Sequence, residues 1–97
     1  MEKHYWPFDV LPVERQTEVH KREIRFLEAA HQQGLRSYEY HGIVFGAEAD
    51  GGREGVMFQR GTNRWEVSLG TSEKEESCVF YQDFDAAADA ILQWLSD

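Results

Sequence analysis

A change of hydrophobic period at Gly34 constrains this chain more than any other feature of its sequence. Between residues 13 and 33, apolar and neutral side chains recur at spacings of three and four, which is the period of one helix face. After Gly34, short segments rich in aromatic and β-branched residues alternate with turn signals, which is typical of strands. The sequence therefore predicts an α+β protein that opens with a helix over 13–33 and ends that helix at a C-capping glycine.

Four short strands are predicted in the second part of the chain, and they span residues 38–45, 56–59, 64–69 and 77–81. Turn signals separate them at Asp50-Gly51-Gly52, at Gly61-Thr62-Asn63 and at Gly70-Thr71-Ser72. Because short connections favour pairing of sequential strands, we expect residues 38–81 to form a four-stranded antiparallel β-meander.

A second helix is predicted over residues 85–96, where apolar side chains again form a helical stripe. Both helices are expected to pack on the sheet, since this arrangement buries all of their apolar faces at once. Residues 1–12 are expected to be an irregular, aromatic-rich segment. The 97 residues are enough for one hydrophobic core, so residues 1–97 are interpreted as a single domain.

The negative charge of the chain is unevenly distributed. The net charge is −8, and residues 34–97 carry twelve acids against five bases, whereas residues 1–33 carry six against five. Such a field repels nucleic acid and anionic membranes and attracts a basic protein, although the same charge also keeps a small domain soluble. With one cysteine, no signal-peptide pattern and no run of about 18 apolar residues, the chain is expected to be a cytoplasmic protein.

No catalytic, cofactor or metal site is expected. No metal-ligand spacing occurs among the four histidines, which are His4, His20, His31 and His41. Cys78 is expected to be a buried, inert thiol in the last strand. The Gly51-Gly52 turn lacks the lysine of a phosphate-binding loop, and Glu73 with Glu75 lies in a polar loop where nothing would raise a pKa for acid–base catalysis.

Acidic residues gather instead in two loops of the predicted meander. In a meander the first and third loops leave the sheet at the same end, so their charges would add into one negative rim. Loops on a rigid scaffold commonly carry binding residues. The predicted partner-binding residues are Glu48, Asp50, Glu54, Glu73, Glu75 and Glu76, with Tyr81 as a neighbouring aromatic anchor.

The order of these segments resembles the small immunity proteins of bacterial polymorphic-toxin and contact-dependent inhibition systems. The run Phe26-Leu27-Glu28-Ala29-Ala30, followed by Gly34-Leu35 and Tyr38, is similar to their opening helix and first strand. Trp65-Glu66-Val67 is similar to their tryptophan strand, residues 70–77 to a charged hairpin, and residues 84–95 to the closing helix. The arginine-glycine pair often found in that hairpin is missing here, because Leu69 precedes Gly70.

This resemblance implies a cytoplasmic antitoxin that binds and blocks a cognate toxin. Together with the acidic loops, it predicts a non-enzymatic inhibitor that covers a basic active-site cleft of that toxin. A second hypothesis is a structural or adaptor domain that forms a homodimer through the aromatic residues Tyr5, Trp6 and Phe8. A third is a small hydrolase or transferase that uses scattered carboxylates and histidines.

Overall fold

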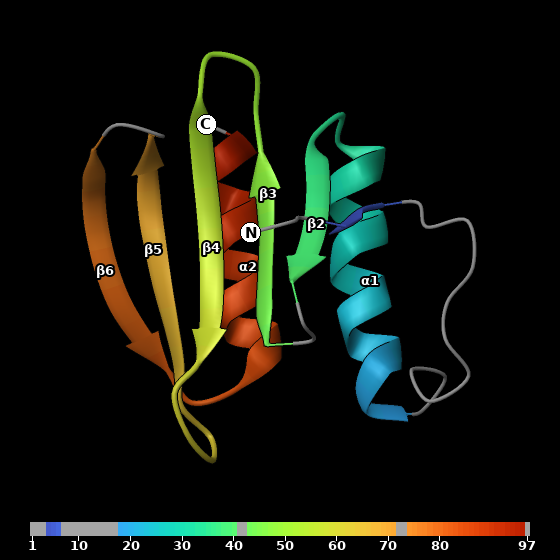
Figure 1. The fold of residues 1–97 in the computed structure, drawn as a ribbon, viewed down its shortest axis with the longest axis vertical. Coiled ribbons are helices and arrows are strands. Elements are labelled where there is room, and N and C mark those ends of the chain that lie inside the picture. Colours follow the sequence, from blue (N-terminus) through green and yellow to red (C-terminus); the bar gives the residue numbers. More distant parts are fainter. Residues whose placement is uncertain (1–3, 7–17, 41–42, 72–73, 97) are drawn as a thin grey trace.

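A computed structural model describes residues 4–6, 18–40, 43–71 and 74–96 of the chain (Figure 1). Its elements, in chain order, are β1 (His4–Tyr5), α1 (Glu18–Gln32), β2 (Arg36–Tyr40), β3 (Val44–Glu48), β4 (Arg53–Gln59), β5 (Trp65–Thr71), β6 (Glu75–Tyr81) and α2 (Phe84–Ser96). The strands form one antiparallel sheet in the order β1-β2-β3-β4-β5-β6. The expected α+β class, with a helix before and a helix after the main strands, is confirmed.

The predicted number of four strands is wrong, because the described residues form a sheet of six. The segment 38–45 was expected to be one strand, but the chain reverses within it and forms the β2–β3 hairpin, in which Tyr38 pairs with Gly46 and Tyr40 with Val44. No asparagine-glycine or double-glycine signal marks this reversal in the sequence, so the aromatic and β-branched residues on both sides read as one strand. The sixth strand is the two-residue β1, which lies within the segment 1–12 that was expected to be irregular; it forms because His4 and Tyr5 pair with β2.

Several predicted boundaries also change. The second predicted strand, 56–59, is the C-terminal part of the seven-residue β4, and β6 begins at Glu75 rather than at residue 77. Within the described residues α1 starts at Glu18, and residues 13–17 of the predicted helix lie outside that part of the chain. The helix ends as expected, because Gly34 has a φ of 83° and its amide donates to the carbonyl of His31.

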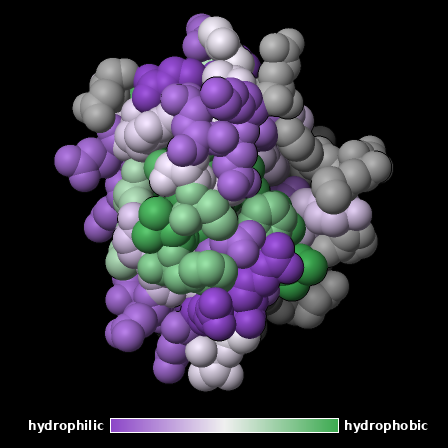
Figure 2. All heavy atoms as spheres, turned by 90° about the vertical axis from the view of Figure 1, so that its left-hand side faces the viewer, coloured by the Kyte–Doolittle hydropathy of each residue, from purple (hydrophilic) through white to green (hydrophobic). Residues whose placement is uncertain are grey.

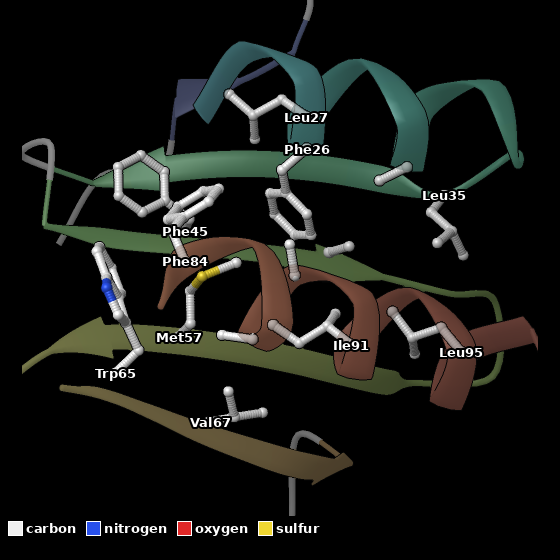
Figure 3. Packing of buried hydrophobic residues seen from close by; sticks show 14 residues of the cluster. Phe26, Leu27, Leu35, Phe45, Met57, Trp65, Val67, Phe84, Ile91 and Leu95 are labelled. Carbon is white, nitrogen blue, oxygen red and sulfur yellow. The ribbon is translucent and has the colours of Figure 1, made fainter. Parts of the chain in front are cut away.

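Both helices cover one face of the sheet, and the core lies between them and that face (Figure 3). Alternate strand residues point toward the helices, and Phe45, Met57, Trp65 and Val67 are almost completely buried there. From α2, Phe84 packs edge-to-face on Trp65 with ring centroids 5.1 Å apart. Each such side chain contributes about 1.5–3 kcal/mol of transfer free energy on burial.

In the described part of the chain no helix lies on the opposite face of the sheet, and we call this face the open face. In Figure 1 the strands pass in front of α2, so the open face is toward the viewer. The pairing register assigns to it the residues that alternate with the core positions, among them Tyr5, Tyr38, Glu48, Glu54, Val56, Phe58, Glu66, Ser68, Cys78 and Phe80. The open face therefore mixes aromatic side chains with carboxylates.

The two edges of the sheet differ. At one edge, β1 pairs with β2, the amide of Trp6 donates to the carbonyl of Ser37 at 2.8 Å, and the Trp6 indole donates to Glu28 of α1 at 2.6 Å. At the other edge lies β6, which is the last strand of the sheet order. None of the helices described is long and apolar enough to cross a membrane.

Candidate functional site

Three glutamates on neighbouring strands form a row across one end of the open face. Glu48 on β3 pairs directly with Glu54 on β4, Glu54 pairs with Gly70 on β5, and Gly70 pairs with Glu75 on β6. Side chains of directly paired residues lie with Cβ atoms about 4.5–5.5 Å apart, so Glu48 and Glu54 are close neighbours. We call Glu48, Glu54 and Glu75 the acidic row.

Arg36 and Asp50 complete the β3 side of this row. The Nε atom of Arg36 lies 3.5 Å from a carboxylate oxygen of Glu48, and its Nη1 atom lies 3.0 Å from Asp50 in the β3–β4 turn. These contacts raise the pKa of Arg36, chiefly through the hydrogen bond to Asp50. The Asp50 side chain is 98% exposed, so the pair orients charges at the surface and adds little stability.

Tyr38 positions Glu54, the middle residue of the acidic row. Its ring crosses over Gly46 of β3, where an added Cβ would lie only 2.5 Å from the phenolic oxygen, and its hydroxyl donates to Glu54. Tyr5 packs edge-to-face on this ring with centroids 5.6 Å apart and donates its own hydroxyl to Glu48 at 3.0 Å. Burial and the bond to Glu54 raise the pKa of Tyr38 far above its ordinary value, so the phenol stays a donor.

The β5–β6 hairpin positions the last carboxylate of the row. The register shifts between Leu69 and Gly70, and Glu75 accepts a hydrogen bond of 2.7 Å from the Ser68 hydroxyl on the same face. Gly70 is needed for this approach of the strands, since a Cβ there would lie 2.3 Å from the carbonyl oxygen of Lys74.

The structure brings together most of the residues predicted to bind a partner. The β3–β4 turn and the β5–β6 hairpin leave the sheet at the same end, as Figure 1 shows, because Arg53 pairs with Thr71. Glu48, Asp50, Glu54 and Glu75 therefore share that end, and Glu76 is exposed beside them. Glu73 lies outside the described residues.

Tyr81 does not join this group. It ends β6 at the side of the sheet away from Glu75, pairs with Trp65 and packs against the core. The aromatic residue beside the acids is instead Tyr5, which is 44% exposed. Sequence reasoning named Tyr5 only as an association residue, because nothing local shows that β1 adds to β2 and carries it to Glu48.

The other end of the open face has basic residues that the sequence analysis did not single out. Arg64 stacks on the Phe80 ring with 4.2 Å from Cζ to the centroid, and Arg60 lies over Phe58 at 5.3 Å. Arg60 also forms an ion pair of 3.3 Å with Glu66. The only advance signal was that both arginines flank the Gly61-Thr62-Asn63 turn. The open face is thus acidic at one end and basic at the other.

Cys78 contradicts its expected burial, since its side chain is exposed on the open face of β6. The strand was predicted correctly, but it lies at the sheet edge, where a side chain has neighbours on one side only. Residual desolvation and the charges of Glu66 and Glu75 raise the pKa of the Cys78 thiol, which keeps it protonated near neutral pH.

The described surface has hollows at two places, and the residues of the acidic row line neither of them. One of about 400 Å³ lies between α1 and α2, where the Arg22 guanidinium stands 5.1 Å from the Phe84 ring centroid. Another of about 360 Å³ lies beside Tyr5, Trp6 and His31. Among the described residues, no three histidine, cysteine or acidic side chains are placed to hold a metal ion.

Three comparisons were made, with models of protein families, with curated proteins and with solved structures, and none of them finds a match to this chain.

Proposed function

We propose that this protein is an immunity protein that binds a toxin domain and covers a basic active-site cleft with the acidic row. The observation that carries the proposal is the convergence of Glu48, Glu54, Glu75 and Asp50 at one end of the open face. Arg36 offsets part of this charge, while Glu54 and Glu75 accept hydrogen bonds from the neutral hydroxyls of Tyr38 and Ser68. The site therefore keeps a net negative charge.

The rigidity of the row supports this role. Its carboxylates stand on paired strands, and hydrogen bonds from Tyr5, Tyr38 and Ser68 hold three of them in place before any partner arrives. Binding then costs little side-chain entropy, and the negative field speeds the capture of a basic surface. Tyr5, half exposed beside Glu48, offers the aromatic contact that interface centres favour.

The test is Asp50→Lys against a toxin domain encoded next to this protein, measured by titration calorimetry at several salt concentrations. We expect affinity to fall roughly tenfold to a hundredfold, because an attractive charge becomes repulsive at the contact. The slope of affinity against salt should also become shallower.

The matched control is Asp89→Lys on the exposed side of α2, which changes the net charge by the same two units away from the open face. This variant should keep the wild-type affinity. Equal losses in the two variants would mean that only the overall charge matters, and no loss in either would remove the acidic row as the contact.

The alternative function, self-association through the aromatic N-terminal segment, loses one of its three residues. Trp6 is half-buried, packs against the core and donates its indole hydrogen to Glu28, so it serves the fold. Phe8 lies outside the described residues. Only Tyr5 remains as an exposed aromatic side chain of that segment in the described part of the chain.

A further inference from the structure

Strand β6 presents an apolar edge to the surroundings. Val79 is 44% exposed and Phe80 is 46% exposed. Cys78, which precedes them in β6, is exposed as well. Figure 2 looks onto this side of the molecule and shows apolar surface gathered in its middle, with hydrophilic groups above and below. The opposite edge is different, because β1 and Trp6 cover β2 there.

The backbone of β6 is ready to pair with another strand. The amide of Arg60 donates to the carbonyl of Arg64, so the polar groups of Arg64 point toward β4. The backbone N–H and C=O groups of successive residues in a strand point to opposite sides. Those of Trp65 therefore point toward Tyr81 on β6, and those of Glu66 point back toward β4. It follows that the N–H and C=O groups of Cys78 and Phe80 point outward, away from β5.

Charge is also arranged along this edge. Glu75 and Glu76 stand at the start of β6, whereas Arg64 lies over Phe80 near its end, 4.2 Å from the ring centroid. A strand that is acidic at one end and basic at the other is complementary to a copy of itself in the antiparallel direction. In a parallel arrangement, like charges would face each other.

From this edge we propose that two copies of the chain pair through β6, antiparallel and about a two-fold axis, so that one sheet continues through both. Full overlap of Glu75–Tyr81 with its copy puts the middle residue, Cys78, on the axis. Glu76 then faces Phe80 of the second copy and the Arg64 that covers it. The apolar side chains of Cys78, Val79 and Phe80 become buried at the centre.

A second copy fits this edge better than an unrelated strand does, because the edge carries both halves of the charge complementarity: the acids at the start of β6 and Arg64, which lies over Phe80 near its end. Outward backbone groups occur at Cys78 and Phe80, two residues apart, so the central pairing matches donor to acceptor without a shift of register. The two-fold axis repeats every contact, which is the usual geometry of a homodimer. The two proposed contacts share Glu75, which belongs to the acidic row and starts β6, whereas Glu48, Glu54 and Asp50 lie on the β3–β4 side of the sheet.

Sedimentation of the full chain over a range of concentrations tests the dimer, and charge exchange tests its register. Glu76→Lys and Arg64→Glu should each weaken dimerisation by roughly tenfold, because each puts like charges together at two symmetric places. The double variant should recover wild-type dimerisation, which a merely structural role of either residue would not produce. Both side chains are exposed, so folding, checked by circular dichroism, should be unchanged.

Cys78 gives an independent readout, since it is the only cysteine of the chain. Residues directly opposite in a hydrogen-bonded antiparallel pair have Cα atoms about 5.5 Å apart, within the range of disulfides. Diamide, which accepts the two electrons and two protons of the thiols, should therefore link the two Cys78 residues of a dimer at concentrations where the dimer is present.

Two control variants should dimerise like wild type. Asp89→Lys controls for the change of charge, and Tyr5→Ser controls for the exposed aromatic side chain at the opposite edge of the sheet. A monomer at every soluble concentration would overturn the proposal. So would a dimer that Tyr5→Ser abolishes and Glu76→Lys leaves intact, because it would place the contact at the opposite edge.

Discussion

Tyr38 links three strands of the open face through a single side chain. It rises from β2, crosses Gly46 of β3 and reaches Glu54 of β4, and only a glycine leaves room for this path. The ring is 2% exposed, so its hydroxyl needs a partner, and Glu54 supplies one. Order in the acidic row thus depends on a residue that is itself uncharged.

Tyr38→Phe is expected to lower the free energy of unfolding at neutral pH by about 1–2 kcal/mol, the usual cost of losing such a hydrogen bond. The pKa of Tyr38 is raised in the fold, so the stabilisation is complete below its ordinary value of 10.0 and declines as pH rises above it. Urea unfolding should therefore show that the difference in free energy of unfolding between wild type and Tyr38→Phe becomes smaller at alkaline pH.

Tyr5→Phe is the control for this change, since its hydroxyl also donates to a carboxylate but at an exposed site. It should cost less than Tyr38→Phe. If the difference in free energy of unfolding between wild type and Tyr38→Phe stayed the same as the pH was raised into the alkaline range, the assigned role of the Tyr38 phenol would be contradicted.

Among the elements, the β5–β6 hairpin depends on the absence of a side chain at one position. A Cβ on Gly70 would meet the Lys74 carbonyl at 2.3 Å and the Glu75 Cα at 2.8 Å, and both are backbone atoms that cannot rotate away. The shift of register beside Gly70 and the close approach of the hairpin are therefore coupled.

Gly70→Ala is expected to destabilise the protein by about 1–3 kcal/mol through this overlap, and to speed hydrogen exchange of β6 amides more than those of β3. Gly51→Ala serves as the comparison, because φ is +92° there and nothing lies within 4 Å of the added Cβ. It should cost about 1–2 kcal/mol from backbone strain and leave exchange in β6 unchanged. Uniform faster exchange in Gly70→Ala would argue against a local hairpin effect.

At the scale of the whole molecule, a contact between Trp6, next to β1, and Glu28 of α1 joins one edge of the sheet to a helix. The Trp6 indole donates to Glu28 of α1, and Gln32 donates to the same carboxylate at 3.0 Å. The Trp6 bond, followed by that from Gln32, lowers the pKa of Glu28 below its ordinary value of 4.5. The charge of the half-buried Glu28 thereby holds an edge strand in place.

Trp6→Phe is expected to destabilise the protein at neutral pH and to do so less in acid. Because the pKa of Glu28 is lower in the folded state, its carboxylate stabilises the fold at pH values above its ordinary pKa. This stabilisation is lost as the pH falls through the pKa of the folded state. Denaturant unfolding followed at neutral pH and below about pH 4 should show the difference shrinking. Gln32→Ala should show the same trend with a smaller amplitude, and a difference constant with pH would refute the link.

Local patterns predicted much of this fold. The spacing predicted an apolar face of the first helix that included Phe26, Leu27 and Ala30, which are buried, but also His31, which is exposed. The alternation of Trp65 and Val67 identified the buried face of β5. The β2–β3 hairpin escaped the same reasoning because its two strands have similar composition and no strong turn signal. The candidate site was also predicted only in part. The sequence indicated the acids near the two turns, but it did not predict that they lie beside Tyr5, Tyr38 and Gly46.

The sequence by itself determined the α+β class, both helices and the turns near the acids, because each depends on residues within a few positions of one another. The acids were expected in loops, but Glu48, Glu54, Glu75 and Glu76 lie within strands, since the strands extend further toward the turns than their composition indicated. Only the tertiary structure decided how the rest is arranged: among the described residues six strands pair, β1 covers one edge while no strand lies beyond β6, and Glu48, Glu54 and Glu75 share a row. These features depend on register between segments far apart in the chain, and register follows from the simultaneous burial of every apolar face.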